Sequence, residues 1–232
     1  MKLNRNQLKY LAIVAMFIDH VAWAFVPYTS AMGQIMHFIG RLTGPMMAYF
    51  LAQGYAHTRN VKKYALRLGI FALISWPAFS LFERGMWPLL DMCSFGVIYT
   101  LFLGLLAIWL WDKGRCPKWV KVLGIIALCF LSLLGDWPVF DVLWPLALYR
   151  HRDEPGKQVR DFCIGGAVNL LVSYSMPWWT MLNALGVFVV PLLLMKCYSG
   201  ESGSKAAFHK WFFYGFYPLH LLALWVLKQY IS

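Results

Sequence analysis

Residues 9–25 read KYLAIVAMFIDHVAWAF, an apolar run that Asp19 and His20 interrupt near its middle. With its flanks, the run is long enough to cross a bilayer as a helix. Ionisable groups at membrane depth are costly and are usually functional. Lys9 and His20 lie about three helical turns apart, so they share one helix face at a separation of about 16 Å. A cation at the surface and an imidazole deep inside suit a long, anionic, thioester-carrying cofactor that enters from the cytoplasm.

The composition predicts an integral membrane protein. Apolar residues make up 60% of the chain and charged residues 13%, whereas a soluble domain carries about 25% charged residues. The net charge of +11 is explained by Lys and Arg in cytoplasmic loops, so we expect no nucleic-acid partner. The five cysteines are scattered through apolar runs, which predicts neither a metal site nor a disulfide framework.

Apolar runs and charge clusters alternate along the chain. We expect an all-α fold, a polytopic bundle of about nine transmembrane spans that forms one membrane-embedded domain over residues 1–232. The sixth span is shorter than the roughly 17 residues that a crossing needs, so it is tilted, partial or re-entrant. The expected spans are 9–28, 35–57, 64–83, 93–111, 119–134, 138–149, 160–175, 178–196 and 211–230.

The basic residues predict the orientation. In a nine-span arrangement, all Lys and Arg residues except Arg41, Arg84 and Lys228 fall on one side. By the positive-inside rule this side is cytoplasmic, which puts the N-terminus inside and the C-terminus outside. We therefore expect a multi-pass protein of the bacterial cytoplasmic membrane.

Four intramembrane residues are candidates for chemistry. Asp19 and His20 are adjacent, so their side chains point about 100° apart and are unlikely to bond each other. Arg41 lies in the second expected span on the face of His37, with Asp19 as its expected counter-ion. His220 follows Pro218 in the last span, at a depth similar to that of His20. The alternatives are structural: a polar pair that joins helices, an Arg41 that reaches the outer interface, and a satisfied core histidine.

A compact basic hairpin separates the second and third expected spans. It contains His57, Arg59, Lys63 and Arg67. Such a cluster can bind phosphate groups. It is also what membrane topology alone would place on the cytoplasmic side, so both interpretations stay open.

Several segments carry a family resemblance: Leu8-Lys9, Met16–His20, Ile39-Gly40-Arg41, Pro45, Gly54, His57–Asn60, Lys63-Tyr64, Arg67-Leu68, residues 71–75 and Tyr217–His220. In these segments, densest in the first third, the chain resembles the TraX family of membrane proteins. The family's best-known activity, acetylation of the N-terminus of conjugative pilin, is what the resemblance implies. The wider group resembles the acyltransferase 3 membrane enzymes, which carry a basic residue, ten residues and then a catalytic histidine on the first span. Lys9 and His20 match that spacing.

The resulting hypothesis is an acetyltransferase that uses acetyl-CoA and no metal. Lys9, His57, Arg59, Lys63 and Arg67 would bind the donor, and His20 would be the general base. Asp19, Arg41 or His220 would fix the tautomer of His20 or stabilise the oxyanion. The acceptor would be the amine or hydroxyl of pilin or of another envelope molecule.

Two other functions remain open from the sequence. A proton-coupled transporter or channel would use Asp19, His20, Arg41 and His220 as its relay. A non-catalytic assembly component would need none of them for chemistry.

Overall fold

The computed structural model describes residues 2–87, 94–172, 178–204 and 206–231. Residue 93, which begins the fourth expected span, and residues 173–175, which end the seventh, lie outside the described residues. Within the described residues the chain is helical, apart from isolated bridges at Leu3–Tyr198 and Phe95–Gly135. The helices are α1 (Arg5–Phe25), α2 (Ala31–Gly40), α3 (Thr43–His57), α4 (Val61–Arg84), α5 (Val97–Lys113), α6 (Lys118–Ser132), α7 (Phe140–Arg150), α8 (Pro155–Val172), the 3₁₀ helix η2 (Trp178–Phe188), α9 (Val189–Cys197) and α10 (Ala207–Ile231).

The all-α prediction is confirmed, but one expected span is broken. Residues 35–57 were expected to form one continuous helix, whereas the structure has α2 and α3 with a break at Arg41 and Leu42. Pro45 lies in the first turn of α3, where its missing N–H costs no helical hydrogen bond. A helix that ran through this position would lose that bond, so the chain starts a new helix instead.

The helices α1 and α4 are, among the described residues, the two that are long and apolar enough to cross a membrane. On α4, the apolar side chains of Leu66, Ile70, Leu73 and Ile74 are all exposed, and their spacing places them on one stripe of the helix. An exposed apolar stripe of this kind is what lipid contact requires. That the chain crosses the membrane about nine times remains a prediction.

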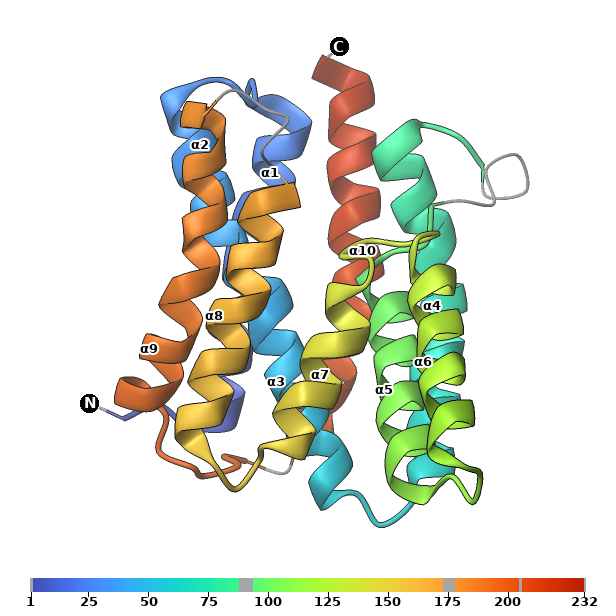
Figure 1. Cartoon of the computed structure of the whole chain (residues 1–232). Coiled ribbons are helices and arrows are strands. Elements are labelled where there is room, and N and C mark those ends of the chain that lie inside the picture. Colours follow the sequence, from blue (N-terminus) through green and yellow to red (C-terminus); the bar gives the residue numbers. More distant parts are fainter. Residues whose placement is uncertain (1, 88–93, 173–177, 205, 232) are drawn as a thin grey trace. The chain divides into compact units, whose positions relative to one another are not determined.

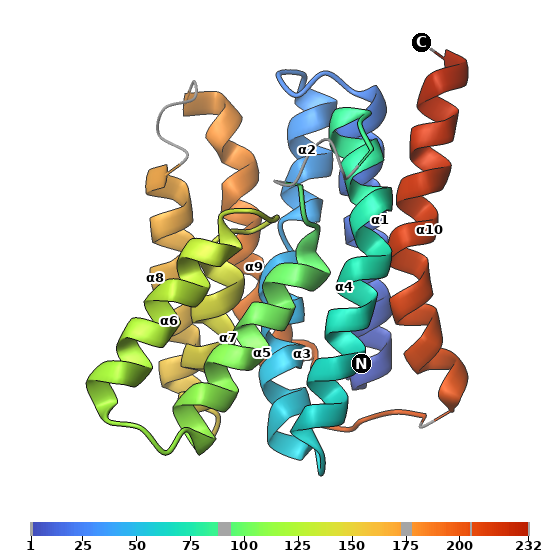
Figure 2. The same cartoon turned by 90° about the vertical axis from the view of Figure 1, so that its right-hand side faces the viewer.

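The chain packs as two compact units, and each is described by itself. The first unit comprises Met1–Met47 and Val159–Ser232. In it, α1 packs against α2 and against α10, the red helix beside it in Figure 2, and α2 packs against η2. Figure 1 shows α8 beside α9 in the same unit. The N-terminal segment is tied to the end of α9, because the Leu3 amide donates to the Cys197 carbonyl at 2.6 Å and the Ser199 amide donates to the Leu3 carbonyl at 2.9 Å.

The second unit, Ala48–Gln158, is built around α5. This helix packs against α4, α6 and α7. A Cβ atom at Gly104 would lie 2.1 Å from the Asp141 carbonyl oxygen, so glycine is required for α5 and α7 to approach this closely. Beside this contact, the Thr100 Oγ1 and Asp141 Oδ2 atoms lie 2.8 Å apart and join the two helices.

Candidate functional site

Two histidines from opposite ends of the chain meet in the first unit. His20 lies in the second half of α1, and His220 lies on α10 one turn after Phe216. Their Nδ1 (His20) and Nε2 (His220) atoms are 3.1 Å apart. Both side chains are buried. The structure therefore brings together the two imidazoles that the sequence singled out.

The hydrogen bonds of this pair fix which nitrogens carry protons. The Nδ1 atom of His220 lies 2.8 Å from the carbonyl oxygen of Phe216, which can only accept, so this nitrogen donates. A neutral His220 then has its lone pair on Nε2, and Nδ1 of His20 must donate to it. The neutral His20 consequently keeps its own lone pair on Nε2, which is the arrangement of an oriented general base.

Aromatic rings surround the histidine pair. The Phe216 ring stacks on His220 at a centroid distance of 4.7 Å. Phe17 and Tyr217 approach the two imidazoles edge-on, at 6.2 Å from His220 and 6.4 Å from His20 respectively. These rings limit water around the imidazoles, so a hydrogen bond there is stronger than one in bulk water.

Asp19 has a different partner from the one expected. Its Oδ1 atom lies 2.7 Å from Nδ1 of His37 on α2. The expected pairing of Asp19 with Arg41 is therefore wrong. His37 precedes Arg41 by one turn of α2 and is the residue that faces the Asp19 position of α1. Asp19 and His37 form a second ionisable pair on the same stretch of α1 as His20.

Arg41 is instead held by a residue of η2. Its Nε atom donates to Oδ1 of Asn183 at 3.2 Å. The amide nitrogen of Asn183 donates to the Tyr28 hydroxyl at 2.9 Å and to Oε1 of Gln34 at 3.0 Å. Asn183 is buried, so this network fixes the Arg41 side chain through atoms that have little access to water.

Lys9 is the first residue of the predicted first span and lies about one turn into α1. Its Nζ atom is 5.3 Å from the centre of the Phe213 ring on α10. A cation over a ring face is attracted by it. Lys9 and His20 are thus both on α1 and both face α10, which confirms the shared helix face.

The basic hairpin belongs to the second unit. Arg59 and Lys63 are exposed, and Asn60 caps α4 by accepting from the Lys63 amide at 2.9 Å. Arg67 lies over the Tyr64 ring at 5.2 Å. His57 is used locally, because its Nδ1 atom lies 2.8 Å from the Gln53 carbonyl oxygen. Two predicted donor-binding cations therefore present their charges to solvent.

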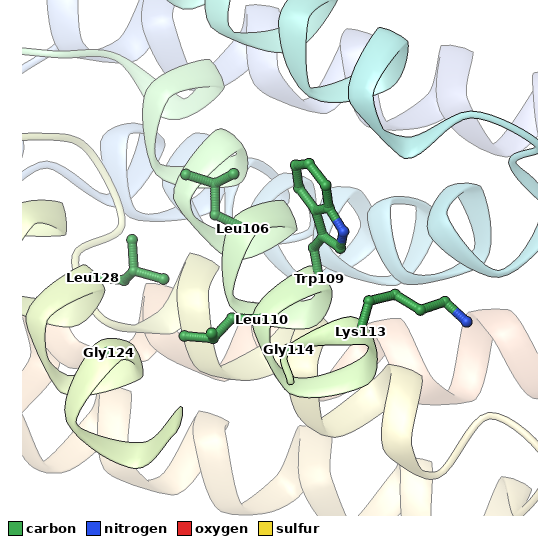
Figure 3. A pocket seen from close by; sticks show the side chains of 7 residues that line it. All are labelled: Leu106, Trp109, Leu110, Lys113, Gly114, Gly124 and Leu128. Carbon is green, nitrogen blue, oxygen red and sulfur yellow. The ribbon is translucent and has the colours of Figure 1, made fainter. Parts of the chain in front are cut away.

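An open groove of about 490 Å³ also lies in the second unit, between α5 and α6. Figure 3 shows Leu110 and Leu128 directed into the space between these helices, with Gly124 forming part of its wall. The lining is mostly apolar and contains none of the predicted site residues. We look for the chemistry among the buried polar side chains of the first unit, because Lys113 is the one ionisable side chain among the residues that line this groove.

Sequence reasoning missed three members of the site. Asn183 and Gln34 attracted no attention because single amides in apolar runs carry no distinctive spacing. His37 was noticed only as a neighbour of Arg41. Its pattern of an imidazole four residues before an arginine in an apolar span was the signal that could have identified it. No group of three or more metal-ligating side chains occurs in the described parts of the chain.

A protein family and a known protein each match almost the whole chain. The model of a family described as TraX protein matches residues 4–228. A probable fimbrial assembly protein FimC, serogroup H1, from Dichelobacter nodosus is 31% identical over 237 residues, an alignment that covers 97% of this chain and 96% of that protein. No solved structure matches the chain.

Proposed function

Because the chain belongs to the TraX family, we propose that it is a membrane acyltransferase that moves an acetyl group from acetyl-CoA to an acceptor amine or hydroxyl. Family membership and the fimbrial assembly relative both fit a role connected with conjugation or pili. A pilin N-terminus, or another protein, peptide or glycan of the envelope, is the proposed acceptor. The observation that carries the chemistry is the buried, hydrogen-bonded pair of His20 and His220.

His20 is the proposed general base. Its Nε2 lone pair takes the proton from the acceptor nitrogen or oxygen as that atom attacks the acetyl carbonyl carbon. The C–S bond of the thioester then breaks, and the leaving thiolate takes the proton from His20. His220 holds His20 in the required tautomer and shares the positive charge while the proton is in transit. Arg41, fixed by Asn183, is the proposed stabiliser of the oxyanion.

The donor is proposed to bind from the cytoplasm. Its phosphates would be held by cations whose charges suit charge-assisted hydrogen bonds. Lys9 is the candidate in the first unit, and Arg59, Lys63 and Arg67 are the candidates in the second. His57 is the remaining proposed contact. The pantetheine arm would follow the α1 face from Lys9 toward His20, a distance of about 16 Å for three helical turns.

The decisive variant is His20→Ala. We expect expression and acetyl-CoA binding to be retained while acetyl transfer falls by at least about 10²-fold, the scale for losing a general base. The matched control is His209→Ala, which removes a histidine of the same unit that bonds the Tyr10 hydroxyl at 2.7 Å. Radiolabelled acetyl transfer in membranes with the native acceptor measures both. Near-wild-type turnover in a folded His20→Ala protein would exclude this mechanism.

A proton-coupled transporter is the second candidate, because a hydrogen-bonded pair of buried imidazoles also suits a proton relay. In that case a pH gradient should drive solute uptake into vesicles that contain the protein. Acetyl-CoA should not then protect His20 from an imidazole-modifying reagent. Protection of His20 by acetyl-CoA without solute uptake would favour the acyltransferase.

A further inference from the structure

The ring of His37 contains a buried nitrogen for which the described residues provide no hydrogen-bond partner. Its Nδ1 atom bonds Asp19 at 2.7 Å, whereas its Nε2 atom has no hydrogen-bond partner among the described residues. The His37 side chain has no exposed surface at all. A buried polar atom left without a partner costs about 1–3 kcal/mol. Such an atom is commonly retained because something binds it.

The pairing with Asp19 determines what Nε2 can bind. Carboxylate oxygens accept hydrogen bonds, so Nδ1 of His37 carries the proton of the neutral ring and donates to Asp19. The lone pair therefore sits on Nε2. A carboxylate that orients an imidazole in this way also stabilises the imidazolium that forms when Nε2 takes a proton. The missing partner is consequently an N–H or O–H donor.

Two aromatic rings lie against the same imidazole. The Trp23 and Tyr28 rings are stacked at 5.3 Å and lie 4.5 Å and 5.1 Å from the His37 ring centre. Trp23 is 48% exposed, so one of the two rings that lie against the buried imidazole also reaches the surface of the structure. Ring faces of tryptophan and tyrosine attract ammonium groups.

We propose that His37, with Asp19 and the Trp23–Tyr28 stack, binds the protonated amine of the acceptor and takes its first proton. This inference rests on the proposed acyl transfer and assigns the residues that would hold an amine acceptor. Asp19 supplies negative charge, the two rings supply a cation-attracting wall, and Nε2 supplies the proton acceptor.

The proton count of the reaction supports two bases. An amine arrives near neutral pH as R–NH₃⁺, since an α-amino group has a pKa of about 7.7–8.0. His37 takes one proton, and the neutral nitrogen then attacks the acetyl carbonyl carbon to form the C–N bond. His20 takes the second N–H proton and passes it to the thiolate as the C–S bond breaks. The products are the amide, coenzyme A and one proton, which leaves from His37. A hydroxyl acceptor loses a single proton and would need a single base.

The charged and titratable groups that face His37 are few. Asp19 comes from α1, Tyr28 from the segment between α1 and α2, and Arg41 from the next turn of α2. His20 follows Asp19 on α1. The helix η2, which also packs on α2, contributes Asn183 and has no charged residue in its sequence.

The first test measures binding and needs no activity. The full-length protein with ¹⁵N-labelled histidine, in detergent, is titrated with glycinamide, and the His37 ring signals are assigned by their absence from His37→Asn or their displacement in Asp19→Asn. We expect glycinamide to shift the Nε2 signal of His37. N-acetylglycinamide and glycolamide, which lack the amine, should not shift it. An unchanged His37 signal with glycinamide, or an equal shift with glycolamide, would overturn the proposal.

The second test measures transfer from acetyl-CoA to glycinamide. In His37→Asn the new amide can still donate to Asp19, but the Nε2 lone pair is lost. At pH 6.5 about 5% of the amine is neutral, given an α-amino pKa of about 7.8. Because the variant can use only this neutral fraction, we expect its rate of acetyl transfer to fall about 20-fold below the wild-type rate at pH 6.5. At pH 9 the two rates should agree to within threefold. His209→Asn is the control. A loss that is equal at both pH values would show a structural role and reject the base. Absence of transfer by the wild-type protein, both to glycinamide and to the native acceptor in membranes, would reject the acyltransferase function itself, while the binding test would still decide whether His37 holds an amine.

Discussion

Gly40 and Asp19 are packed so tightly that no side chain fits between them. A Cβ atom at Gly40 would lie 2.3 Å from both the carboxyl carbon and Oδ1 of Asp19. The absence of a side chain on α2 is therefore what allows the Asp19 carboxylate to reach His37 one turn earlier. Gly40, at the C-terminal end of α2, therefore leaves room for a side chain of the neighbouring helix α1.

Gly40→Ala should separate Asp19 from His37. The added methyl group must displace a short, half-buried carboxylate, which we expect to destabilise the protein by about 1–3 kcal/mol and to lower acetyl transfer. Thermal unfolding in detergent and the transfer assay measure the two effects. Gly156→Ala is the control, because a Cβ atom there meets nothing within 4 Å. If the two variants have the same unfolding temperature and the same rate of acetyl transfer, the position of Asp19 affects neither stability nor activity.

His220→Gln should affect turnover more than donor binding. The glutamine cannot relay a proton, although its amide can still contact His20, so the tautomer of His20 is held less firmly. We expect kcat to fall by about tenfold to a hundredfold with an unchanged KM for acetyl-CoA. Steady-state kinetics in membranes at matched protein levels test this. A raised donor KM with normal kcat would instead place His220 in the donor-binding site.

Asn183→Leu should destabilise the fold. It removes the hydrogen bonds that join Arg41, Tyr28 and Gln34, and loss of the partner of a buried polar group such as Gln34 costs about 1–3 kcal/mol. Chemical or thermal unfolding of the purified protein measures the loss. Gln53→Leu is the comparison, since Gln53 makes a 3.3 Å contact with the Tyr49 hydroxyl and is expected to change stability by less than about 0.5 kcal/mol. A similarly small change in Asn183→Leu would mean that the hydrogen bonds of Asn183 contribute little to the free energy of unfolding.

Reversing the charges of Arg59 and Lys63 to Glu should weaken acetyl-CoA binding more than tenfold, which corresponds to about 1.4 kcal/mol or more. Binding should also weaken with added salt, because both side chains are exposed. The same double reversal at Arg115 and Lys118 gives the matched comparison. If that second variant loses affinity and the first does not, the phosphate site lies in the α5–α6 connection instead of the basic hairpin.

The distribution of Lys and Arg predicts the topology. Reporter fusions at Lys62, Lys118 and Lys157 should all report the cytoplasm, and a fusion at the C-terminus should report the outside. External readings at two of the three lysines would overturn the orientation and the proposed side of donor entry.

Hydropathy predicted where the helices lie, because burial in lipid or protein leaves long apolar runs in the sequence. It did not predict the break after Gly40, since apolar residues resume after Arg41 and the cause is local backbone chemistry at Pro45. Helical spacing correctly placed Lys9 and His20 on one face of α1. The partners of Asp19 and Arg41 were not predictable in this way, because they depend on the rotation of α2 against α1 and on Asn183, 142 residues further along the chain.

The contact of His20 with His220 spans 200 residues of sequence and has a consequence for biosynthesis. At about 5–20 residues per second, the ribosome needs roughly 10–40 s to make the rest of the chain after His20 emerges. During that time the first helix carries its polar residues into the membrane without the last helix. A nascent or truncated chain therefore lacks the residue that His20 bonds in the complete structure, and we expect it to be a target for quality-control proteases until translation is complete.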